Sequence, residues 1–373
     1  MAGIYVHIPF CKQQCTYCDF HFSTTFSAYR EEMISKLLIE LTQRQDYVAN
    51  KTIETIYFGG GTPSILSLEE ITALLDTIYA NYAVIDQVEI SLEANPDDIT
   101  VENLLAWKDA GINRLSIGLQ SFKAEDLEWM NRAHTVGEAL NCVELAKKYG
   151  FENLTVDLMY GLPDLSPDEW QHHIQTIISM DVPHISAYCL TIEEKTVLHN
   201  LVGKGKIVPA SEDTQSDQFM MLLEILEASG YQQYEISNFS KPEFESKHNS
   251  NYWKGEWYLG VGPSAHSFNG VSRRWNVSNN QRYMKAIAEE TSVSETEMLT
   301  KENQFNERIL TGLRTMYGVN LISLNEIIPL PAQFMEDVSK FVEADWMNQN
   351  KNTLFLTKEG RLRADHIASE LFV

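Results

Sequence analysis

Six short apolar runs recur along the first half of the chain, and they begin near Ile4, Thr55, Gln87, Arg114, Leu154 and His184. Each has the length of a strand, and amphipathic helical stretches separate most of them. Between the first two runs we expect a helix whose apolar face is formed by Met33, Ile34, Leu37, Leu38 and Leu41. Strands that alternate with helices predict a parallel sheet, which right-handed crossovers curl into a partial or full barrel. The predicted fold class is therefore α/β, with six β-α units.

Helix starts and the second half of the chain complete this outline. Capping boxes at 67–70 and 166–169 mark two helix starts, the second with a proline at its first helical position. The stretch 203–216 is rich in Gly, Lys, Pro, Ser and Asp and predicts a linker, followed by a helix at 217–228. The β-α rhythm then stops, and a strand at 353–356 leading into a helix at 358–371 resembles a winged-helix-like cap. We therefore divide the chain into a core domain, 1–205, and a smaller mixed α+β domain, 206–373.

Composition and charge narrow the class of partner. A chain of 373 residues suggests two domains with ample material for a core. Its 29 basic and 52 acidic residues give a net charge of −23, which argues against nucleic acid and anionic membrane surfaces as partners. No apolar run reaches the length that spans a bilayer. We expect a cytoplasmic protein without a transmembrane segment.

Three cysteines carry the most informative chemistry. Cys11, Cys15 and Cys18 form a C-x-x-x-C-x-x-C loop directly after the apolar run 4–8. Three closely spaced thiolates can hold three irons of a cubane iron–sulfur cluster and leave the fourth iron open to a small chelating ligand. The loop therefore indicates a reactive centre rather than a pure electron carrier.

Other interpretations of these cysteines remain open. A structural zinc site would need a fourth ligand, which His7 or His21 could supply. Disulfides are disfavoured because five cysteines are an odd number and because we expect no signal peptide. The remaining two, Cys142 and Cys189, lie in apolar stretches and are expected to be small buried hydrophobic residues.

A glycine run, residues 59–63 (Gly-Gly-Gly-Thr-Pro), follows the second predicted strand. Glycines at the carboxyl end of a strand allow the backbone to approach a ligand closely and offer it N–H and C=O groups. A tight turn into the helix that starts at the 67–70 capping box is the simpler interpretation. Alone, the run does not decide between the two.

Polar residues occur where further strands end. Parallel sheets of this kind bind ligands at the carboxyl ends of their strands, which selects Glu93, Gln120 and Asp157. Glu93 could instead organise the turn at Pro96, Gln120 could be an ordinary loop residue, and Asp157 could cap the turn at Gly161. Because a buried carboxylate within an apolar strand needs a partner, we favour a functional role for Glu93 and Asp157.

A second unusual cluster lies at residues 248–253, His-Asn-Ser-Asn-Tyr-Trp. A neutral imidazole can ligate iron while neighbouring aromatic rings pack on a flat macrocycle. A histidine with aromatic neighbours is more often a satisfied residue at a domain contact. The residues alone therefore leave haem binding as the less favoured interpretation.

The cysteine loop and the glycine run together resemble the radical S-adenosylmethionine superfamily, which has both in this order and has six β-α units. The resemblance implies a [4Fe-4S] cluster whose open iron is chelated by the methionyl amino and carboxylate groups of S-adenosylmethionine. An electron from the cluster would then cleave the sulfonium and produce a 5′-deoxyadenosyl radical. Tyr17, inside the C-x-x-C, is the candidate for packing near adenine.

A narrower resemblance covers nearly the whole chain. Beyond the loop and the glycine run, its motifs are Asp19 with Phe20 and the stretches 93–96, 118–122, 157–163 and 248–253. In this order they are similar to the haem chaperones of the HemW type, relatives of the oxygen-independent coproporphyrinogen III oxidases. Phe20 stands where the oxidases have a further cysteine, and we expect no segment ahead of the first strand such as the oxidases carry. Both features favour the chaperone branch, whose H-N-x-x-Y-W motif is linked to haem binding.

The resemblance implies roles for individual residues. Cys11, Cys15 and Cys18 would ligate the cluster, and the first S-adenosylmethionine would contact Tyr5, Gly60 and Glu93. In the oxidases a second S-adenosylmethionine touches residues that match Tyr17, Gly61, Thr62, Gln120, Arg132 and Asp157. Use of that second site by this branch is an open question, and Arg132 could instead be a surface cation at a helix end. His248 is the expected haem ligand.

Three functions follow as hypotheses. The leading one is a haem chaperone that binds haem and passes it to respiratory haem-acceptor proteins, with a homodimer suggested by the resemblance. The alternative is an enzyme, an oxygen-independent coproporphyrinogen III oxidase, in which the radical abstracts hydrogen from propionate side chains during oxidative decarboxylation. A third, radical modification of tRNA, is disfavoured by the acidic charge.

Overall fold

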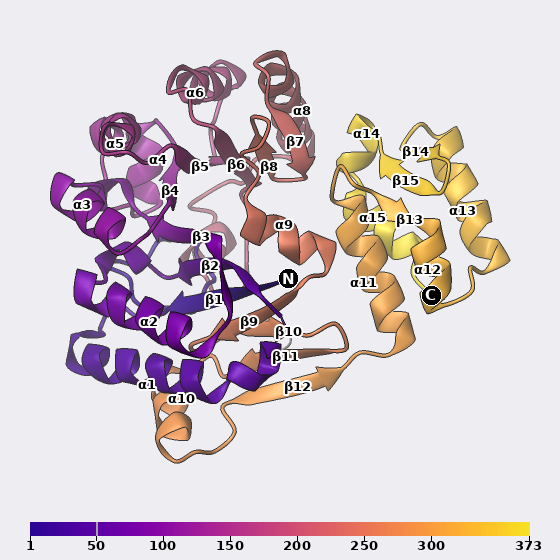
Figure 1. Ribbon diagram of the computed structural model, residues 1–373. Coiled ribbons are helices and arrows are strands. Elements are labelled where there is room, and N and C mark those ends of the chain that lie inside the picture. The colour runs from indigo at the N-terminus through magenta and orange to yellow at the C-terminus, as the bar shows by residue number, and fades with distance from the viewer. Residues whose placement is uncertain (50) are drawn as a thin grey trace.

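A sheet of twelve strands organises most of the molecule, which is described by a computed structural model for residues 1–49 and 51–373 (Figure 1). Its strand order is β12-β11-β10-β9-β1-β2-β3-β4-β5-β6-β8-β7. The six consecutive strands in the middle pair in parallel. They are β1 (Ala2–Ile8), β2 (Ile53–Gly60), β3 (Val84–Ala94), β4 (Arg114–Gln120), β5 (Asn153–Tyr160) and β6 (His184–Cys189). The predicted parallel sheet is confirmed.

Helices between these strands cover one face of the sheet (Figure 1). They are α1 (Arg30–Gln43), α2 (Leu68–Asn81), α3 (Val101–Asp109), α4 (Ala124–Trp129), α5 (Val136–Lys148) and α6 (Pro167–Ser179). The predicted capping boxes start α2 and α6, with Ser67 and Ser166 each accepting from the backbone N–H three residues on. Apolar residues of the helices and of the outer sheet face form one continuous core. Burial of the apolar surface in this core is the main contribution to the stability of the packed helices and sheet.

The strands β7 to β12 extend the same sheet at both edges. β9 (Trp257–Val261) pairs in parallel with β1, and β10 (His266–Phe268), β11 (Ser272–Asn276) and β12 (Ser294–Met298) continue outward antiparallel. At the other edge β8 (Asn238–Ser240) pairs with β6, and β7 (Gln232–Glu235) pairs with β8. The helices of this part are α7 (Val197–Gly203), α8 (Glu212–Ala228), α9 (Lys247–Lys254) and α10 (Asn280–Ala288).

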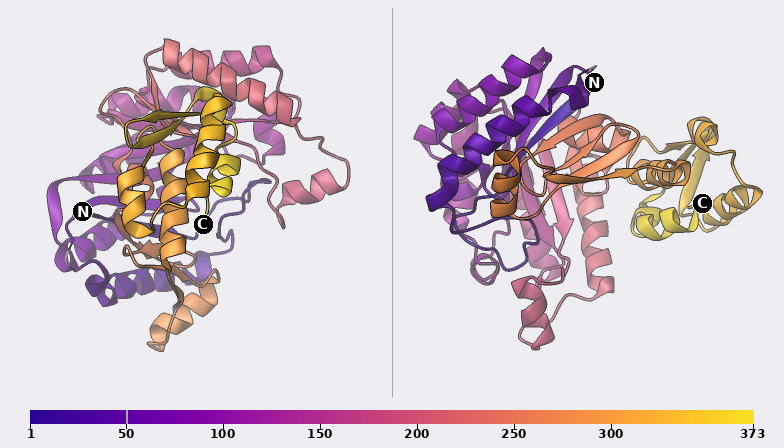
Figure 2. Two further views of the ribbon diagram at one scale, coloured as in Figure 1. Left: turned by 90° about the vertical axis from the view of Figure 1, so that its right-hand side faces the viewer. Right: turned by 90° about the horizontal axis from the view of Figure 1, so that it is seen from below.

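A second hydrophobic core lies in the last part of the chain, between Phe305 and Leu371. Its helices are α11 (Lys301–Leu313), α12 (Leu321–Ile327), α13 (Ala332–Glu343), α14 (Lys358–Arg361) and α15 (Ala364–Glu370). They pack on a small antiparallel sheet of β13 (Val319–Asn320), β15 (Thr353–Leu356) and β14 (Met347–Asn350). We call residues 301–373 the C-terminal module, and Figure 2 shows it beside the large sheet.

The two cores separate near residue 300, whereas the sequence suggested domains 1–205 and 206–373. Residues 206–298 add strands to the first sheet and apolar side chains to the first core. The domain boundary at residue 205 stays a prediction. The first hydrophobic core, however, extends beyond the six β-α units and includes residues up to Val293. The linker expected at 203–216 is wrong in its second half, because α8 begins at Glu212. The single helix expected at 358–371 is interrupted between Arg361 and Ala364.

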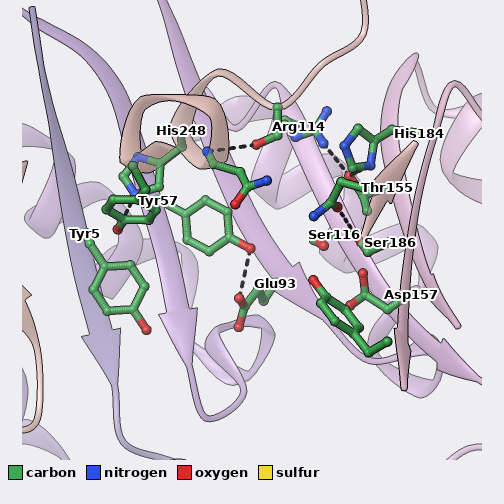
Figure 3. Close-up of a pocket in the computed structure, with 15 residues that line it drawn as sticks. Tyr5, Tyr57, Glu93, Arg114, Ser116, Thr155, Asp157, His184, Ser186 and His248 are labelled. Carbon is green, nitrogen blue, oxygen red and sulfur yellow. Dashed lines mark hydrogen bonds between the residues drawn. The ribbon is translucent and has the colours of Figure 1, made fainter. Parts of the chain in front are cut away.

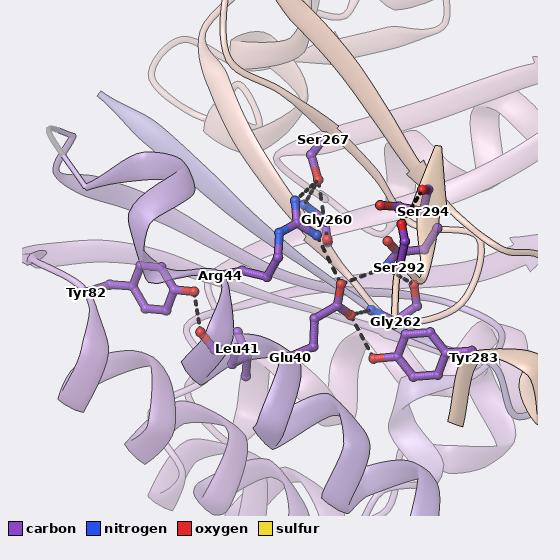
Figure 4. A network of polar contacts seen from close by, with 11 residues as sticks. Glu40, Leu41, Arg44, Tyr82, Gly260, Gly262, Ser267, Tyr283, Ser292 and Ser294 are labelled. Carbon is purple, nitrogen blue, oxygen red and sulfur yellow. Dashed lines mark hydrogen bonds and ion pairs between the residues drawn. The ribbon is translucent and has the colours of Figure 1, made fainter. Parts of the chain in front are cut away.

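A buried polar network explains how the added strands attach to α1 (Figure 4). Glu40 of α1 is 1% exposed and forms an ion pair with Arg44 at 3.0 Å. It also accepts hydrogen bonds from the Gly262 N–H at 2.8 Å, the Asn276 amide at 2.8 Å and the Tyr283 hydroxyl at 2.7 Å. Every donor except Arg44 belongs to residues 257–288. One carboxylate therefore joins the first β-α unit to a segment more than two hundred residues later.

Glu40→Gln is expected to destabilise the protein by about 3–5 kcal/mol, because it leaves the buried guanidinium of Arg44 without its charged partner. The measurement is urea denaturation followed by circular dichroism. Glu289→Gln is the matched control, since the pair of Glu289 with Lys285 is 55% and 73% exposed and should contribute less than about 1 kcal/mol. Equal stability of the two variants would contradict the role of the network.

The residues described by the structure include no helix that is long and apolar enough to cross a membrane.

Candidate functional site

The inner face of the parallel sheet is polar, and it lines a cavity of about 220 Å³ (Figure 3). Successive residues of a strand point to opposite faces. On β4, Leu115 and Ile117 are buried in the core while Arg114 and Ser116 line the cavity. The same alternation holds along the neighbouring strands. The side chains that line the cavity are Tyr5, Tyr57, Glu93, Arg114, Ser116, Thr155, Asp157, His184, Ser186, Tyr188, Asn238, Ser246, His248, Asn249 and Tyr252.

This alternation is the signal that sequence reasoning missed. Strands of a parallel sheet that is buried on both faces have near-continuous hydrophobic runs. Here β4 has the sequence Arg-Leu-Ser-Ile-Gly-Leu-Gln and β3 ends Glu-Ile-Ser-Leu-Glu-Ala. A strict period of two in a parallel sheet predicts one polar, ligand-accessible face. It would have selected Arg114, Ser116, Thr155, His184 and Ser186, which the sequence analysis left out.

The cysteine loop lies beyond the carboxyl end of β1 and is held there by neighbouring elements. The Thr62 hydroxyl donates to Cys11 Sγ at 3.4 Å, and Arg132 Nη1 lies 3.4 Å from Cys15 Sγ. The backbone N–H of Thr16 donates to the Met130 carbonyl at 3.0 Å. All three cysteines are partly exposed, so the loop is fixed at its sides and accessible from outside.

A zinc ion and a cubane cluster would use these thiols differently. Within the described part of the chain, no three His, Cys, Asp or Glu side chains converge on a single metal position. Zinc needs four ligands around one centre, whereas the thiolates of a cubane each bind a different iron. His7 Nε2 is hydrogen-bonded to the His21 carbonyl at 2.8 Å, and His21 Nε2 to Asn280 Oδ1 at 2.7 Å. His7 Nδ1 is also 3.2 Å from the Tyr5 hydroxyl, so both ring nitrogens of His7 have partners, whereas for His21 one ring nitrogen is engaged.

Burial makes two of the loop thiols, Cys11 and Cys18, weaker acids in the chain alone. It raises the pKa of Cys11 to about 11 and that of Cys18 to about 12. The hydroxyl of Thr62 opposes the shift at Cys11, and the backbone N–H of Phe20 opposes it at Cys18. Because iron binds the thiolate, loading of a cluster here would release protons.

The glycine run ends β2 and is constrained by the protein itself. A Cβ at Gly60 would lie 2.6 Å from the His7 ring, and one at Gly61 would lie 2.5 Å from the Phe10 carbonyl oxygen. Gly60 also has φ of +104°, a conformation that favours glycine. Close packing of the chain therefore already requires these glycines. Their presence is not independent support for a ligand.

Glu93 lies near the end of β3 and faces the inside of the sheet. It accepts hydrogen bonds from the Tyr57 hydroxyl at 2.8 Å and from the Gly60 N–H at 3.2 Å. Burial raises the pKa of Glu93 to about 7, so that near neutral pH the carboxyl can be protonated or ionised. The Tyr5 ring stacks on Tyr57 with centroids 6.0 Å apart. Glu93 therefore belongs to the cavity wall, and its alternative role in the Pro96 turn is not what the structure shows.

Asp157 and Gln120 lie on the neighbouring strands. Asp157 is the fifth residue of β5 and lines the cavity; burial raises its pKa to about 6. Gln120 is the last residue of β4 and has φ of +68°, a left-handed conformation that is strained for a residue with a side chain. Such strain is concentrated at functional sites. Asp157 lies within β5 and lines the cavity rather than capping the turn at Gly161, and Gln120 ends a strand rather than lying in a loop.

Arg132 lies against two of the other predicted site residues, Cys15 and Tyr17. Its guanidinium contacts Cys15 Sγ and the Tyr17 hydroxyl, both at 3.4 Å, and donates to Asn95 Oδ1 at 2.7 Å. It also donates to the Gly118 carbonyl at 2.9 Å, while its buried Nε has no hydrogen-bond partner among the described residues. The alternative of a surface cation at a helix end is therefore wrong. A buried cation with an unused donor beside the cysteine loop fits an anionic cluster or the polar groups of a bound cofactor.

His248 lines the same cavity as Glu93 and Asp157, and its ring stacks on Tyr57 with centroids 5.0 Å apart, but it is distant from the cysteine loop. It lies on α9, which covers the amino ends of β1 and β2, and a Cβ at Gly3 would be 3.1 Å from its ring. From Gly3 to Ile8 a strand rises about 16 Å, so the cysteine loop is at the opposite end of the sheet. Its Nδ1 is 2.8 Å from Thr55 Oγ1 and its Nε2 is 2.8 Å from the Tyr252 hydroxyl. Burial lowers the pKa of His248 to about 3, so the imidazole is neutral.

A second hollow borders the cysteine loop on the outside. It has a volume of about 440 Å³ and is lined by Gln14, Cys18, Asp19, Phe20, Phe22, Ser23, Thr24, Thr25, Glu194, Lys195 and Thr196. The Phe20 ring is 67% exposed although it is large and apolar. An exposed aromatic ring in a hollow beside Cys18 is a surface on which an apolar ligand could pack.

Comparisons with known proteins agree with this geometry. The family model of the radical SAM superfamily matches residues 5–177, which contain the cysteine loop and most of the parallel strands. The fold is that of the Escherichia coli coproporphyrinogen III oxidase HemN, a radical SAM enzyme, whose solved structure matches with a TM-score of 0.86. That match covers 100% of this chain and 90% of the other at 22% identity. The class of protein is therefore a radical SAM protein with the partial-barrel fold.

The curated relatives define the family more narrowly. The heme chaperone HemW of Bacillus subtilis is 36% identical over 98% of both chains. The heme chaperone HemW of Escherichia coli is 38% identical over 71% of this chain and 69% of its own length. The chain belongs to the HemW family. Membership of the radical SAM superfamily implies S-adenosylmethionine and a [4Fe-4S] cluster as its cofactors.

Proposed function

We propose that this protein is a haem chaperone that binds haem and delivers it to haem-acceptor proteins, and that it carries a [4Fe-4S] cluster ligated by S-adenosylmethionine. The observation that carries the proposal is the 36% identity to a heme chaperone over 98% of the chain. The fold adds a cysteine loop that fits the cluster. The exposed Phe20 stands where the related oxidases have a fourth loop cysteine.

Most of the residues that we propose as cofactor contacts lie in the cysteine loop or toward the carboxyl ends of the strands, and Tyr5 lies in the middle of β1. Cys11, Cys15 and Cys18 would hold the cluster, whose chemistry when loaded is electron transfer to the sulfonium of S-adenosylmethionine. For the first cofactor molecule we propose Tyr5, Gly60 and Glu93. For a second molecule, or for other polar groups beside the loop, we propose Tyr17, Gly61, Thr62, Gln120, Arg132 and Asp157.

These residues have definite tasks in the chain itself. Thr62 donates to Cys11 Sγ and Arg132 to Cys15 Sγ, which orients two thiols of the loop. Hydrogen bonds to sulfur and a nearby positive charge tune the potential of a cluster. Glu93, held by Tyr57 and Gly60, presents a carboxyl that can accept from an ammonium group or donate a proton.

His248 is the proposed axial ligand of haem. Its imidazole is neutral, which is the form that binds iron. Both ring nitrogens are hydrogen-bonded, and the adjoining cavity of about 220 Å³ is below the roughly 300–1,000 Å³ of drug-sized ligand sites. Haem is larger than most such ligands. Ligation by His248 therefore requires α9 to move away from the strand ends.

The function is tested by two parallel assays on one anaerobically reconstituted sample. Haem binding is followed by absorption titration, and transfer by the appearance of haem in an apo-cytochrome b acceptor separated afterwards. The second assay follows conversion of coproporphyrinogen III with S-adenosylmethionine and a reductant. We expect one haem per chain and no protoporphyrinogen.

Two results would contradict the proposal. Turnover of coproporphyrinogen III at many equivalents per chain would assign the oxidase activity instead. Absence of haem binding by a sample with full iron content would remove the chaperone function while leaving the cluster intact. The iron and sulfide content measured on the same sample separates these results from a failed reconstitution.

A further inference from the structure

A buried arginine lies at the end of the cavity that α9 closes (Figure 3). Arg114 is the first residue of β4, is 2% exposed and lines the cavity. Its guanidinium donates through Nη1 to Asn153 Oδ1 and through Nη2 to Thr155 Oγ1. A guanidinium has five N–H donors, so further donors remain.

No carboxylate in the described part of the chain forms an ion pair with Arg114. Both of its partners are neutral. Asp157 lines the same cavity, and burial raises the pKa of its carboxyl, whereas the charge of Arg114, acting through space, lowers it. A buried charge without a paired opposite charge is costly. An anion from outside the chain would remove that cost.

The hydrogen-bond partners of Arg114 are neutral, and the two carboxyls that line the same cavity, Glu93 and Asp157, lie nearer the carboxyl ends of their strands. Burial, followed by the charge of Arg114, lowers the pKa of His184 well below its usual value, so this ring is neutral. His184 Nε2 bonds the Tyr234 hydroxyl at 2.8 Å and its Nδ1 lies 3.1 Å from Thr155 Oγ1. The Tyr188 hydroxyl, which lines the same cavity, is a further neutral donor. A guanidinium whose own hydrogen-bond partners are neutral suits a group with a single negative charge.

We propose that the closed end of the cavity is a carboxylate-binding subsite in which Arg114 is the charged partner of the ligand. Guanidinium and carboxylate match in geometry and can form two parallel hydrogen bonds. The cavity of about 220 Å³ accepts the leading carboxylate of a small molecule, or a carboxylate-bearing side chain of a larger one. The site lies at the opposite end of the sheet from the cysteine loop and is separate from the proposed cluster ligands.

The test uses full-length reconstituted protein and propionate as the probe, with propionamide as its uncharged counterpart. Binding is measured by ligand-observed NMR. We expect the wild-type protein to bind propionate at least tenfold more tightly than propionamide, and Arg114→Gln to lose that preference. Arg273→Gln is the matched control. Arg273 lies on β11, is partly buried, and forms an ion pair with Glu307 of α11. This variant should bind propionate like the wild type.

Equal binding of propionate and propionamide by the wild-type protein would overturn the proposal even if Arg114→Gln does not fold. An unchanged preference in a folded Arg114→Gln variant would overturn it as well. Arg114→Lys keeps the charge but not the two parallel hydrogen bonds, and should retain part of the preference. The propionate arm involves no haem, so its failure and failure of the proposed haem function are distinguishable.

A competition experiment identifies the source of the carboxylate, and this arm rests on the proposed function. Haem carries two propionate groups, whereas its dimethyl ester carries none. Displacement of the propionate probe by haem but not by the ester assigns the subsite to a haem propionate. If neither displaces the probe while wild-type protein still prefers propionate, the subsite serves a smaller carboxylate.

Discussion

Cys15→Ala is expected to abolish cluster binding, with the iron content after anaerobic reconstitution falling from about four per chain to near background. A cubane cluster in this loop has three protein thiolates, and loss of one leaves two irons without a protein ligand. Cys15 also accepts the contact from Arg132 at 3.4 Å, so its removal frees that guanidinium as well. The same result is expected for Cys11→Ala and Cys18→Ala.

Cys142→Ala is the matched control for the cysteine variants. Cys142 is 3% exposed, lies on α5 and donates its S–H to the Ala139 carbonyl, far from the loop. It should keep full iron and sulfide content and the same visible absorption. Measured together, iron, sulfide and the electron paramagnetic resonance signal of the reduced protein decide the result. Full cluster content in Cys15→Ala would contradict ligation by the loop.

His248→Ala is expected to weaken haem binding at least tenfold, because it removes the proposed iron ligand. Measurement is by absorption titration of the reconstituted protein, with the position of the Soret band reporting on the axial ligand. The substitution also leaves the hydroxyls of Thr55 and Tyr252 without a partner, at a cost of about 1–3 kcal/mol for each buried group. A thermal melt of each variant is therefore part of the experiment.

Tyr252→Phe separates ligation from a structural role. It removes the hydroxyl that occupies His248 Nε2 but leaves the ring that meets His248 edge-on with centroids 4.9 Å apart. If His248 ligates haem iron, this variant should bind haem at least as tightly as the wild type. If His248 only holds α9 against β1 and β2, both variants should lose haem binding to the same degree as they lose stability. The second result would contradict the axial-ligand assignment.

If His248 is the axial ligand of haem, α9 must move away from the strand ends. The first turn of the helix is anchored by Glu89, whose carboxylate accepts from the N–H groups of Lys247 and His248. Asn251 donates to Glu54 at 3.0 Å, and Arg314 of the C-terminal module lies over the Trp253 ring at 5.5 Å. The residues of the 248–253 motif therefore join three parts of the molecule. Haem ligation and the position of the C-terminal module are thus expected to be coupled.

Local signals in the sequence determined the β-α part of the fold. Apolar runs placed all six parallel strands within a few residues of their observed starts, from Ala2 of β1 to His184 of β6. The capping boxes at Ser67 and Ser166 placed helix starts because capping depends on residues only three positions apart. The cysteine loop was recognisable for the same reason, since its ligand spacing is contained within eight residues.

Only the tertiary structure decided which distant residues share the site. The sequence suggested that Arg132 could be an exposed cation, but parallel pairing of β4 with its neighbours brings it against Cys15 and Tyr17. The sequence associated His248 with haem binding. It did not show that His248 lies at the strand ends opposite the cysteine loop. It suggested a domain change at residue 206, where strands from 232–298 instead complete the first sheet.

The physical reason is the range of the interactions involved. Helix starts, strand runs and loop spacings are set by neighbours along the chain. Burial of Arg114 without a charged partner, the attachment of Glu40 to residues 257–288 and the position of α9 arise from pairings between segments up to about two hundred residues apart. Those pairings are fixed by the shared core and sheet register, which no local pattern specifies.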